Sequence, residues 1–241
     1  MSEEERQRTI RLKLARMQSR TPGAIATGFP SLDLALGVGG LPRGSIVELF
    51  GPSGGGKTTL ALQIVAHTQQ AGSAAAWIDA DHTFDPAYAA RLSVDLEALP
   101  LGQPESAEEA LEVTRQLAVS GAVDLIVLDS AAALVPRLEL ETSLGEGSAG
   151  MQSRVLASGL RKLAAAARSG VAILFLNQTR GGGENEVSAG GPGLKLYSAV
   201  RIYLEPAAGG VRFRTVKNKV SAPFATGDLQ WGSAVGFVKP A

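Results

Sequence analysis

The sequence contains no cysteine and only two histidines among its 241 residues. Without cysteine the chain forms no disulfide and no thiolate metal site. His67 and His82 are the only imidazoles, so we interpret His82 as a structural residue rather than a metal ligand. The absence of cysteine suits a reducing compartment, and we expect a cytoplasmic protein.

Long apolar runs are also lacking. No stretch approaches the roughly 18 residues that a membrane span requires. The segment Met1 to Arg20 is charged and lacks the apolar centre of a signal peptide. We therefore expect a soluble protein without a membrane partner.

An excess of charge of one sign is missing as well. Lysine and arginine together number 23, and aspartate and glutamate together number 23. Because the chain has no global basic field, any nucleic acid would be held by a local basic patch. A hydrophobic content of 45% supports a sizeable core, enough for one large α/β domain or two small ones.

What the sequence does contain is a glycine-rich phosphate-binding loop. Gly51 to Thr58 match the pattern Gly-x-x-x-x-Gly-Lys-Thr. The apolar segment Ser45 to Phe50 before it predicts a buried strand, and Leu60 to Gln70 after it predicts a helix. Glycines let backbone N–H groups converge on a phosphate, and a helix N-terminus adds its positive dipole. The predicted nucleotide-binding residues of this loop are Gly51, Pro52, Ser53, Gly54, Gly55, Gly56, Lys57, Thr58 and Thr59.

Two acidic residues that follow later apolar strand patterns extend this site. Asp129 ends such a strand, and with the Thr58 hydroxyl it offers hard oxygen ligands for Mg²⁺. Asp81 follows another strand and is placed to polarise a water that attacks the γ-phosphate, while Lys57 supplies a mobile cation. ATP and Mg²⁺ are the predicted cofactors.

The order of the patterns also predicts the fold. Strands alternate with helices, one of which begins at a capping box at Ser106 to Glu109. We therefore expect an α/β fold with a mostly parallel central sheet, helices on both faces, and ATP at the carboxyl ends of the strands. Residues 203 to 238 should add an antiparallel portion at one edge. Within it, the alternation in Val211 to Phe224 predicts an edge-type strand.

These motifs resemble one family. The segments Thr27 to Asp33 and Leu36 to Gly44 are similar to the lead-in of RecA-like P-loop ATPases. The segments Val216 to Lys219 and Ala222 to Phe224 resemble the bacterial RecA recombinase family. The resemblance runs from about Ala24 to Phe237. It implies a RecA-like P-loop ATPase core over residues 23–241, preceded by an N-terminal helix or assembly segment over residues 1–22, with no C-terminal domain.

The resemblance implies further roles around the nucleotide. The family has a glutamate base where Asp81 stands, and the shorter side chain sets the carboxylate back by about 1 Å, which can cost on the order of 10²-fold in rate. We therefore expect slow, DNA-dependent ATP hydrolysis. Asp85, Pro86 and Tyr88 would hold the adenine, and core packing is the alternative for Tyr88. Lys217 and Lys219 would reach a neighbour's ATP, and a solvated strand face is the alternative for both.

Two segments align with the DNA-binding loops of the family. The first, Ala131 to Gly150, reads as an irregular loop, and Arg154 falls on the family's basic position just after it. The second begins at Arg180 and ends at Gly190 and Gly191. It is about five residues shorter than in the family and contains no lysine and no aromatic residue, so it is poorly suited to separating bases.

Residues on either side of the second loop also have predicted roles or positions. Before the loop, the apolar strand pattern is followed by the side-chain amide of Gln178. Gln178 is a candidate sensor that couples the ATP state to the next loop, because an amide there can hydrogen-bond the γ-phosphate or its attacking water. By resemblance, Lys195, Tyr197 and Arg201 would begin the following strand.

We therefore expect an ATP-dependent protein that binds single-stranded DNA in homologous recombination and repair and assembles head to tail. The alternative is a paralogue that exchanges no strands and serves as an ATP-binding accessory in translesion synthesis, with a translesion polymerase as partner. A phosphotransferase is less favoured, because the sequence shows no clear substrate pocket or lid.

Overall fold

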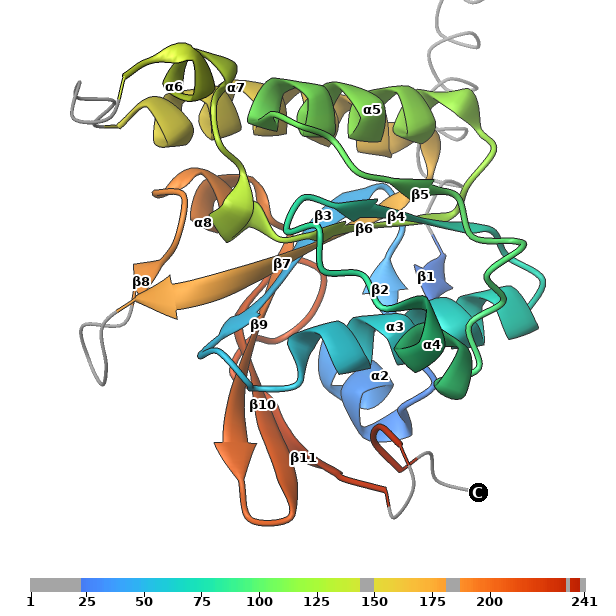
Figure 1. Cartoon of the computed structure of the whole chain (residues 1–241). Helices are drawn as coiled ribbons and strands as arrows, with labels where there is room; N and C mark the ends of the chain where they lie inside the picture. Colours follow the sequence, from blue (N-terminus) through green and yellow to red (C-terminus); the bar gives the residue numbers. More distant parts are fainter. Residues whose placement is uncertain (1–22, 144–149, 181–186, 233–234, 239–241) are drawn as a thin grey trace, which may run out of the picture.

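The computed structural model describes residues 23–143, 150–180, 187–232 and 235–238. These residues form one large twisted sheet with helices on both of its faces (Figure 1). The predicted α/β fold is confirmed. No helix within these ranges has the length and apolarity to cross a bilayer.

The strands of the large sheet run in the order β11-β10-β9-β3-β7-β6-β4-β5, with β8 (Val187–Ser188) paired to β7. Six neighbouring strands, from β9 to β5, are parallel. Their bounds are β9 Val200–Ala207, β3 Ser45–Gly51, β7 Ala172–Arg180, β6 Leu125–Asp129, β4 Ala75–Asp79 and β5 Leu101–Gly102. A separate pair is formed by β1 Ala24–Ile25 and β2 Leu41–Pro42.

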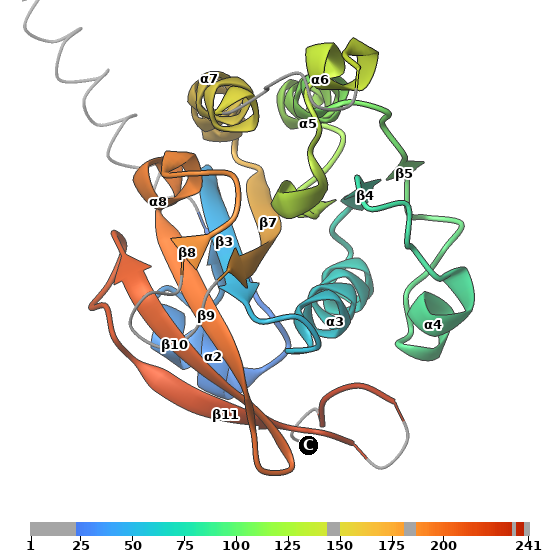
Figure 2. The ribbon, with the colours of Figure 1, turned by 60° about the vertical axis from the view of Figure 1, so that its left-hand side comes forward.

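The antiparallel portion lies at the β9 edge of the parallel strands, as predicted. It consists of β10 Gly210–Asn218 and β11 Thr226–Gln230, which extend together away from the rest of the sheet (Figure 2). The prediction of an edge-type strand was wrong for β10, because β10 pairs with β9 on one side and with β11 on the other. Alternating apolar and charged residues report one buried face, and they do not tell whether both backbone edges are paired.

Alternate residues of the parallel strands pack into two apolar cores, one on each face of the sheet. One core packs against helices α2 Pro30–Leu36, α3 Lys57–Gln70 and α4 Pro86–Arg91. The other packs against α5 Ala107–Ser120, α7 Met151–Ala166 and α8 Gly193–Tyr197. Successive side chains of a strand point to opposite faces of the sheet. The same strands therefore supply the apolar residues against which both layers of helices pack.

Local signals set several element ends. At the predicted capping box, the Ser106 hydroxyl accepts from Glu109 N at 3.3 Å and starts α5. The segment expected to be an irregular loop includes two short helices, η1 Ala131–Ala133 and α6 Arg137–Glu141. A further turn, η2 Ala167–Ser169, follows α7.

The expectation that Lys195 and Tyr197 begin a strand was wrong, since both lie in the short helix α8. Pro192 precedes that helix with φ −76°, a backbone angle that proline fixes and that suits a helix start. Of Lys195, Tyr197 and Arg201, only Arg201 lies in the strand, as the second residue of β9.

Candidate active site

The phosphate-binding loop connects the carboxyl end of β3 to the first turn of α3. Three of its glycines, Gly51, Gly54 and Gly56, have positive φ angles of 154°, 73° and 76°. A Cβ atom at Gly51 would lie 2.0 Å from the backbone oxygen of Leu204, so the loop lies directly against β9 there. Glycine at these positions therefore meets both a conformational and a steric need.

Lys57 lies over this loop. Its Nζ donates to Gly51 O at 3.1 Å and to Pro52 O at 2.7 Å. Burial lowers the pKa of Lys57, and the nearby Asp129 carboxylate opposes that shift. The backbone thus holds a partly desolvated cation beside the N-terminus of α3, where an anionic phosphate would bind.

Thr58 and Asp129 meet although they are far apart in the sequence. The Thr58 hydroxyl donates to Asp129 Oδ2 at 3.0 Å, because β3 and β6 end at the same edge of the sheet. Burial raises the pKa of Asp129 to about 6; the acids Asp81 and Asp79 add to that shift, and the Thr58 bond opposes it.

A hydroxyl and a carboxylate fit Mg²⁺, which takes few protein ligands and shares phosphate oxygens and waters. In the described part of the chain no three His, Cys, Asp or Glu side chains are grouped to hold a metal by themselves.

Asp81 lies in the turn that follows β4. Its Oδ1 accepts from the Ser130 hydroxyl at 3.2 Å, next to Asp129. Burial is the main cause that raises the pKa of Asp81; the Ser130 bond opposes this shift, and Asp79 adds to it. The predicted base is thus close to the predicted metal ligand, at the carboxyl ends of neighbouring strands.

Asp79 is an acid that the sequence interpretation did not use. It is buried at the end of β4, where its carboxylate accepts from Thr83 N and Phe84 N at 3.1 Å and from Gln103 Nε2 at 2.9 Å. These bonds fix the turn that carries Asp81. In the same turn His82 has φ 54° and its Nε2 lies 3.2 Å from Pro104 O, in line with a structural role.

The three predicted adenine-binding residues lie at the start of α4, with Pro86 as its first residue and Tyr88 in its first turn. Asp85 caps that helix, accepting from Tyr88 N at 3.0 Å. The Tyr88 hydroxyl lies 2.8 Å from the Thr59 hydroxyl in the first turn of α3. Tyr88 also packs against one of the two cores, so its ring joins the core to the phosphate-binding helix.

The sequence interpretation missed an aromatic pair beside the loop. Trp231 and Phe237 stack with ring centroids 4.1 Å apart and planes 17° apart. A Cβ atom at Gly56 would lie 2.7 Å from Phe237 Cζ and 3.0 Å from Trp231 Cη2. The side-chain amide of Gln63 in α3 holds the backbone of Phe237. Its Nε2 donates to Phe237 O at 2.9 Å, and its Oε1 accepts from Phe237 N at 2.8 Å. Trp231 keeps 41% of its surface exposed next to this loop.

Comparison with known proteins agrees with this geometry. The family model described as the RecA N-terminal domain matches residues 5–236. The chain belongs to the RecA family.

Curated relatives named Protein RecA are similar to the chain over most of its length. The relative from Thermus thermophilus is 46% identical over 236 residues, which is 91% of this chain and 69% of the relative. The one from Rubrobacter xylanophilus is 45% identical over 242 residues, 93% and 70%. The one from Frankia casuarinae is 45% identical over 230 residues, 88% and 67%.

Three of the four residues named for DNA binding come together in this RecA-family fold. Gly190 and Gly191 have φ 80° and 79°, and Cβ atoms there would lie 2.7 Å from Leu156 Cδ2 and 2.2 Å from Ser153 Oγ. The glycines therefore pack against the first turns of α7, which carries the exposed Arg154.

The fourth, Arg180, is the last residue of β7. Residues 144–149 and 181–186, in the predicted first and second loops, lie outside the described residues, as does the predicted assembly segment 1–22.

Gln178 and the two lysines occupy separate places. The side chain of Gln178 is exposed at the end of β7, near the carboxyl end of the phosphate-loop strand β3. Lys217 lies on β10 and its Nζ donates to Lys195 O at 2.5 Å and to Leu196 O at 3.2 Å. Lys219 is exposed one residue beyond β10. The hydrogen bonds of Lys217 thus go to α8.

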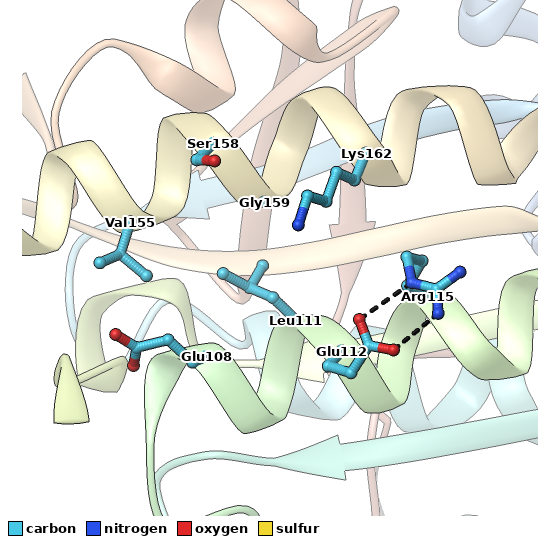
Figure 3. Close-up of a pocket in the computed structure, with 8 residues that line it drawn as sticks. All are labelled: Glu108, Leu111, Glu112, Arg115, Val155, Ser158, Gly159 and Lys162. Carbon is cyan, nitrogen blue, oxygen red and sulfur yellow. Dashed lines mark hydrogen bonds and ion pairs between the residues drawn. The ribbon is translucent and has the colours of Figure 1, made fainter.

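A cavity of about 370 Å³ lies elsewhere, between α5 and α7 (Figure 3). The two helices approach closely at Gly159, where a Cβ atom would lie 2.5 Å from Leu111 Cδ1. The charged residues that line the cavity include Lys162 and the Glu112–Arg115 ion pair. Its lining residues include none of the predicted site residues.

Proposed function

We propose that the chain is a RecA-type ATPase that binds Mg-ATP at the phosphate loop and acts on single-stranded DNA in homologous recombination and repair. One observation carries this proposal: Thr58 and Asp129, from separate parts of the sequence, meet at 3.0 Å beside Lys57. This pairing of a helix-start hydroxyl with a strand-end carboxylate is what a Mg-nucleotide site requires.

The base in this proposal is Asp81. A water aligned with the γ-phosphate gives its proton to the Asp81 carboxylate while its oxygen attacks phosphorus and ADP leaves. Ser130 orients that carboxylate by donating to it. Lys57 and the N-terminus of α3 stabilise the charge on the phosphate oxygens, and bound Mg²⁺ would neutralise further charge there.

The base and sugar of the nucleotide would lie between α4 and the aromatic pair. Tyr88 joins α4 to α3, and the partly exposed Trp231 lies beside Gly56. Aromatic faces stack on any nucleobase, and Asp85 at the start of α4 offers a carboxylate edge.

The DNA-binding part of the proposal uses Arg154 and Arg180 with the glycine pair Gly190 and Gly191. Backbone N–H groups of a glycine segment follow a phosphate backbone without reading sequence. Residues 1–22 would serve as an assembly segment ahead of an ATPase core that begins at residue 23. Lys217 and Lys219 would contact the ATP of the next subunit in a head-to-tail assembly.

A second candidate function is an ATP-binding accessory that exchanges no strands, with a translesion polymerase as partner. It is favoured by the short second loop, which contains Glu184 and Glu186 and no lysine. The deciding experiment measures ATP turnover with and without single-stranded DNA, with electron microscopy of the same mixtures. Turnover stimulated by DNA together with filaments supports the recombinase. ATP binding without either favours the accessory.

A further inference from the structure

A buried carboxylate stands in the strand that leads into the phosphate loop. Glu48 is fully buried in β3, three residues before Gly51, in a strand whose other central residues are apolar. A buried charge is tolerated only when it is paired and hydrogen-bonded. The partners of Glu48 therefore show what this charge is connected to.

Both oxygens of Glu48 are occupied. Arg201, which lies opposite Glu48 in β9, donates from Nε to Glu48 Oε2. Asn177 of β7 donates from Nδ2 to Glu48 Oε1 at 2.9 Å. The guanidinium of Arg201 also stacks on Phe50, with Cζ 4.2 Å from the ring centroid. One carboxylate thus ties together the three central strands of the sheet.

The two partners of Glu48 continue to the returning end of the second loop. Arg201 Nη2 donates to the Ser188 hydroxyl at 3.2 Å, and Asn177 Nδ2 donates to Ala189 O at 3.0 Å. Asn177 also accepts from Gln178 N at 2.9 Å, and Ala189 N donates to Gln178 O at 2.9 Å. The backbone of Gln178 is held on both sides by the same network.

Stability alone gives a weak reason for this arrangement. A buried ion pair often adds no more stability than apolar side chains of the same volume. The specific geometry instead gives two routes from the phosphate-loop strand to residues 188 and 189. A displacement of β3 must either carry that segment along or break charge-assisted hydrogen bonds.

We propose that Glu48, Arg201, Asn177 and Ser188, hereafter the hub, are positioning residues that transmit the nucleotide state of the phosphate loop to the returning end of the second loop. The proposal rests on the proposed function, because it assumes that this loop faces DNA. The hub residues act through β3 and β8 (Val187–Ser188) rather than by touching the nucleotide.

Hydrogen exchange measured by mass spectrometry tests the hub on the full chain. The probe is Mg²⁺ with adenylyl imidodiphosphate, a non-hydrolysable ATP analogue, and the readout is exchange of the peptide that covers residues 187–191. In the wild-type protein we expect the analogue to slow exchange there by about tenfold or more. Coupling between sites is typically 5- to 150-fold, so an effect of this size is within range.

The decisive variant is the double substitution Glu48→Met/Arg201→Met. It replaces the ion pair by apolar side chains of similar length, which is often neutral for folding. We expect the affinity for the analogue to stay within about threefold, while the analogue-dependent change at 187–191 falls below about twofold. If the four residues had only a structural role, a folded double variant would keep the analogue-dependent slowing of exchange at residues 187–191.

Two further variants keep the test falsifiable. Ser188→Ala cuts only the Arg201–Ser188 arm and leaves the buried pair in place, so partial loss of the response is expected even where the double variant fails to fold. The control is Arg212→Gln/Asp228→Asn, an exposed ion pair of 2.8 Å between β10 and β11, which should behave as wild type.

The outcomes separate the hub from the proposed function. A folded double variant with the wild-type response would overturn the hub, and so would a wild-type protein that binds the analogue without any change at 187–191. Failure to bind the analogue at all would overturn the hub and the nucleotide site together. The DNA-binding role depends on the separate turnover measurement with single-stranded DNA.

Discussion

The site proposed for the nucleotide and the surface proposed for DNA differ in how their described residues are held. At the nucleotide end, hydrogen bonds of 2.7 to 3.2 Å already join Lys57, Thr58, Asp81 and Asp129 to their neighbours. At the other surface Arg154 is exposed on α7 beside the glycine pair Gly190 and Gly191, and Arg180 ends β7.

This difference follows from what each ligand demands. A triphosphate and its metal need charges placed to within a fraction of an ångström, so their residues stand on strand ends and a helix start. A DNA backbone is long and repeats along its length, so weak contacts from several subunits add up. Substitutions at the proposed nucleotide site should therefore weaken ATP binding or turnover in each single chain. Substitutions at the proposed DNA surface should act through the assembly of several subunits on DNA.

The largest effect is expected from Lys57→Ala. The phosphates lose their nearest cation, and charge-assisted hydrogen bonds are the strong ones. We expect affinity for Mg-ATP to fall by at least about 100-fold, measured by titration with a fluorescent ATP analogue. Lys162→Ala, in the groove of Figure 3, is the matched control. Unchanged affinity in the Lys57 variant would refute the site.

The second effect concerns the distance between the Asp81 carboxylate, the proposed base, and the attacked γ-phosphate. Asp81→Glu adds one methylene and moves the carboxylate toward the attacked phosphate. We expect turnover to rise about tenfold, because an error of about 1 Å can cost on the order of 10²-fold. Steady-state ATP hydrolysis measures the change, and Asp81→Asn should lower it. If Asp81→Glu slows turnover, the water is oriented by another group.

Much of the arrangement at the proposed nucleotide site was predictable, because its residues stand at recognisable spacings. The phosphate loop is contiguous, and Asp129 and Asp81 each follow a recognisable strand. Parallel strands bring such ends to one edge of the sheet, so the meeting of Thr58 with Asp129 follows from the order of the motifs.

Other contacts could not be predicted from spacing. Trp231 and Phe237, which follow β11 in the chain, lie against Gly56, a packing that no local pattern encodes. Glu48 carries one weak signal, a lone acid in an apolar strand, but its partners come from β7 and β9. Lys195 and Tyr197 were misassigned because the residues after Pro192 form a single helical turn.

The third prediction concerns Arg154 on the surface proposed for DNA. Arg154→Ala removes one exposed cation beside the glycine pair. We expect affinity for an oligothymidylate to fall about fivefold at low salt, with the slope of log K against log salt shallower by about 0.7 for each phosphate that is no longer neutralised. Arg161→Ala, on the same helix seven residues later, is the control. If the Arg154 variant and the control bind alike, Arg154 does not contact DNA.

The last and smallest effect concerns Lys217, which connects the two regions if it contacts a neighbour's ATP. Burial, together with the nearby cations Lys219 and Arg201, lowers the pKa of Lys217 to about 8, and the Glu48 carboxylate opposes that shift. Because this folded-state pKa lies below the ordinary lysine value of 10.5, the folded state disfavours the charged form. The contribution of Lys217 to unfolding free energy is therefore least favourable below about pH 8 and improves as pH rises toward 10.5.

Assembly should depend on pH in the opposite direction, because contact with a phosphate needs the charged amine. Between pH 7 and pH 9 the protonated fraction of Lys217 falls from roughly nine-tenths to one-tenth. A bound phosphate favours the cation, so we expect only about a threefold loss of ATP-dependent assembly, followed by light scattering. Lys217→Arg stays charged throughout this range and should remove the pH dependence. A wild-type protein whose assembly is unchanged from pH 7 to pH 9 would show that Lys217 lies outside the subunit boundary.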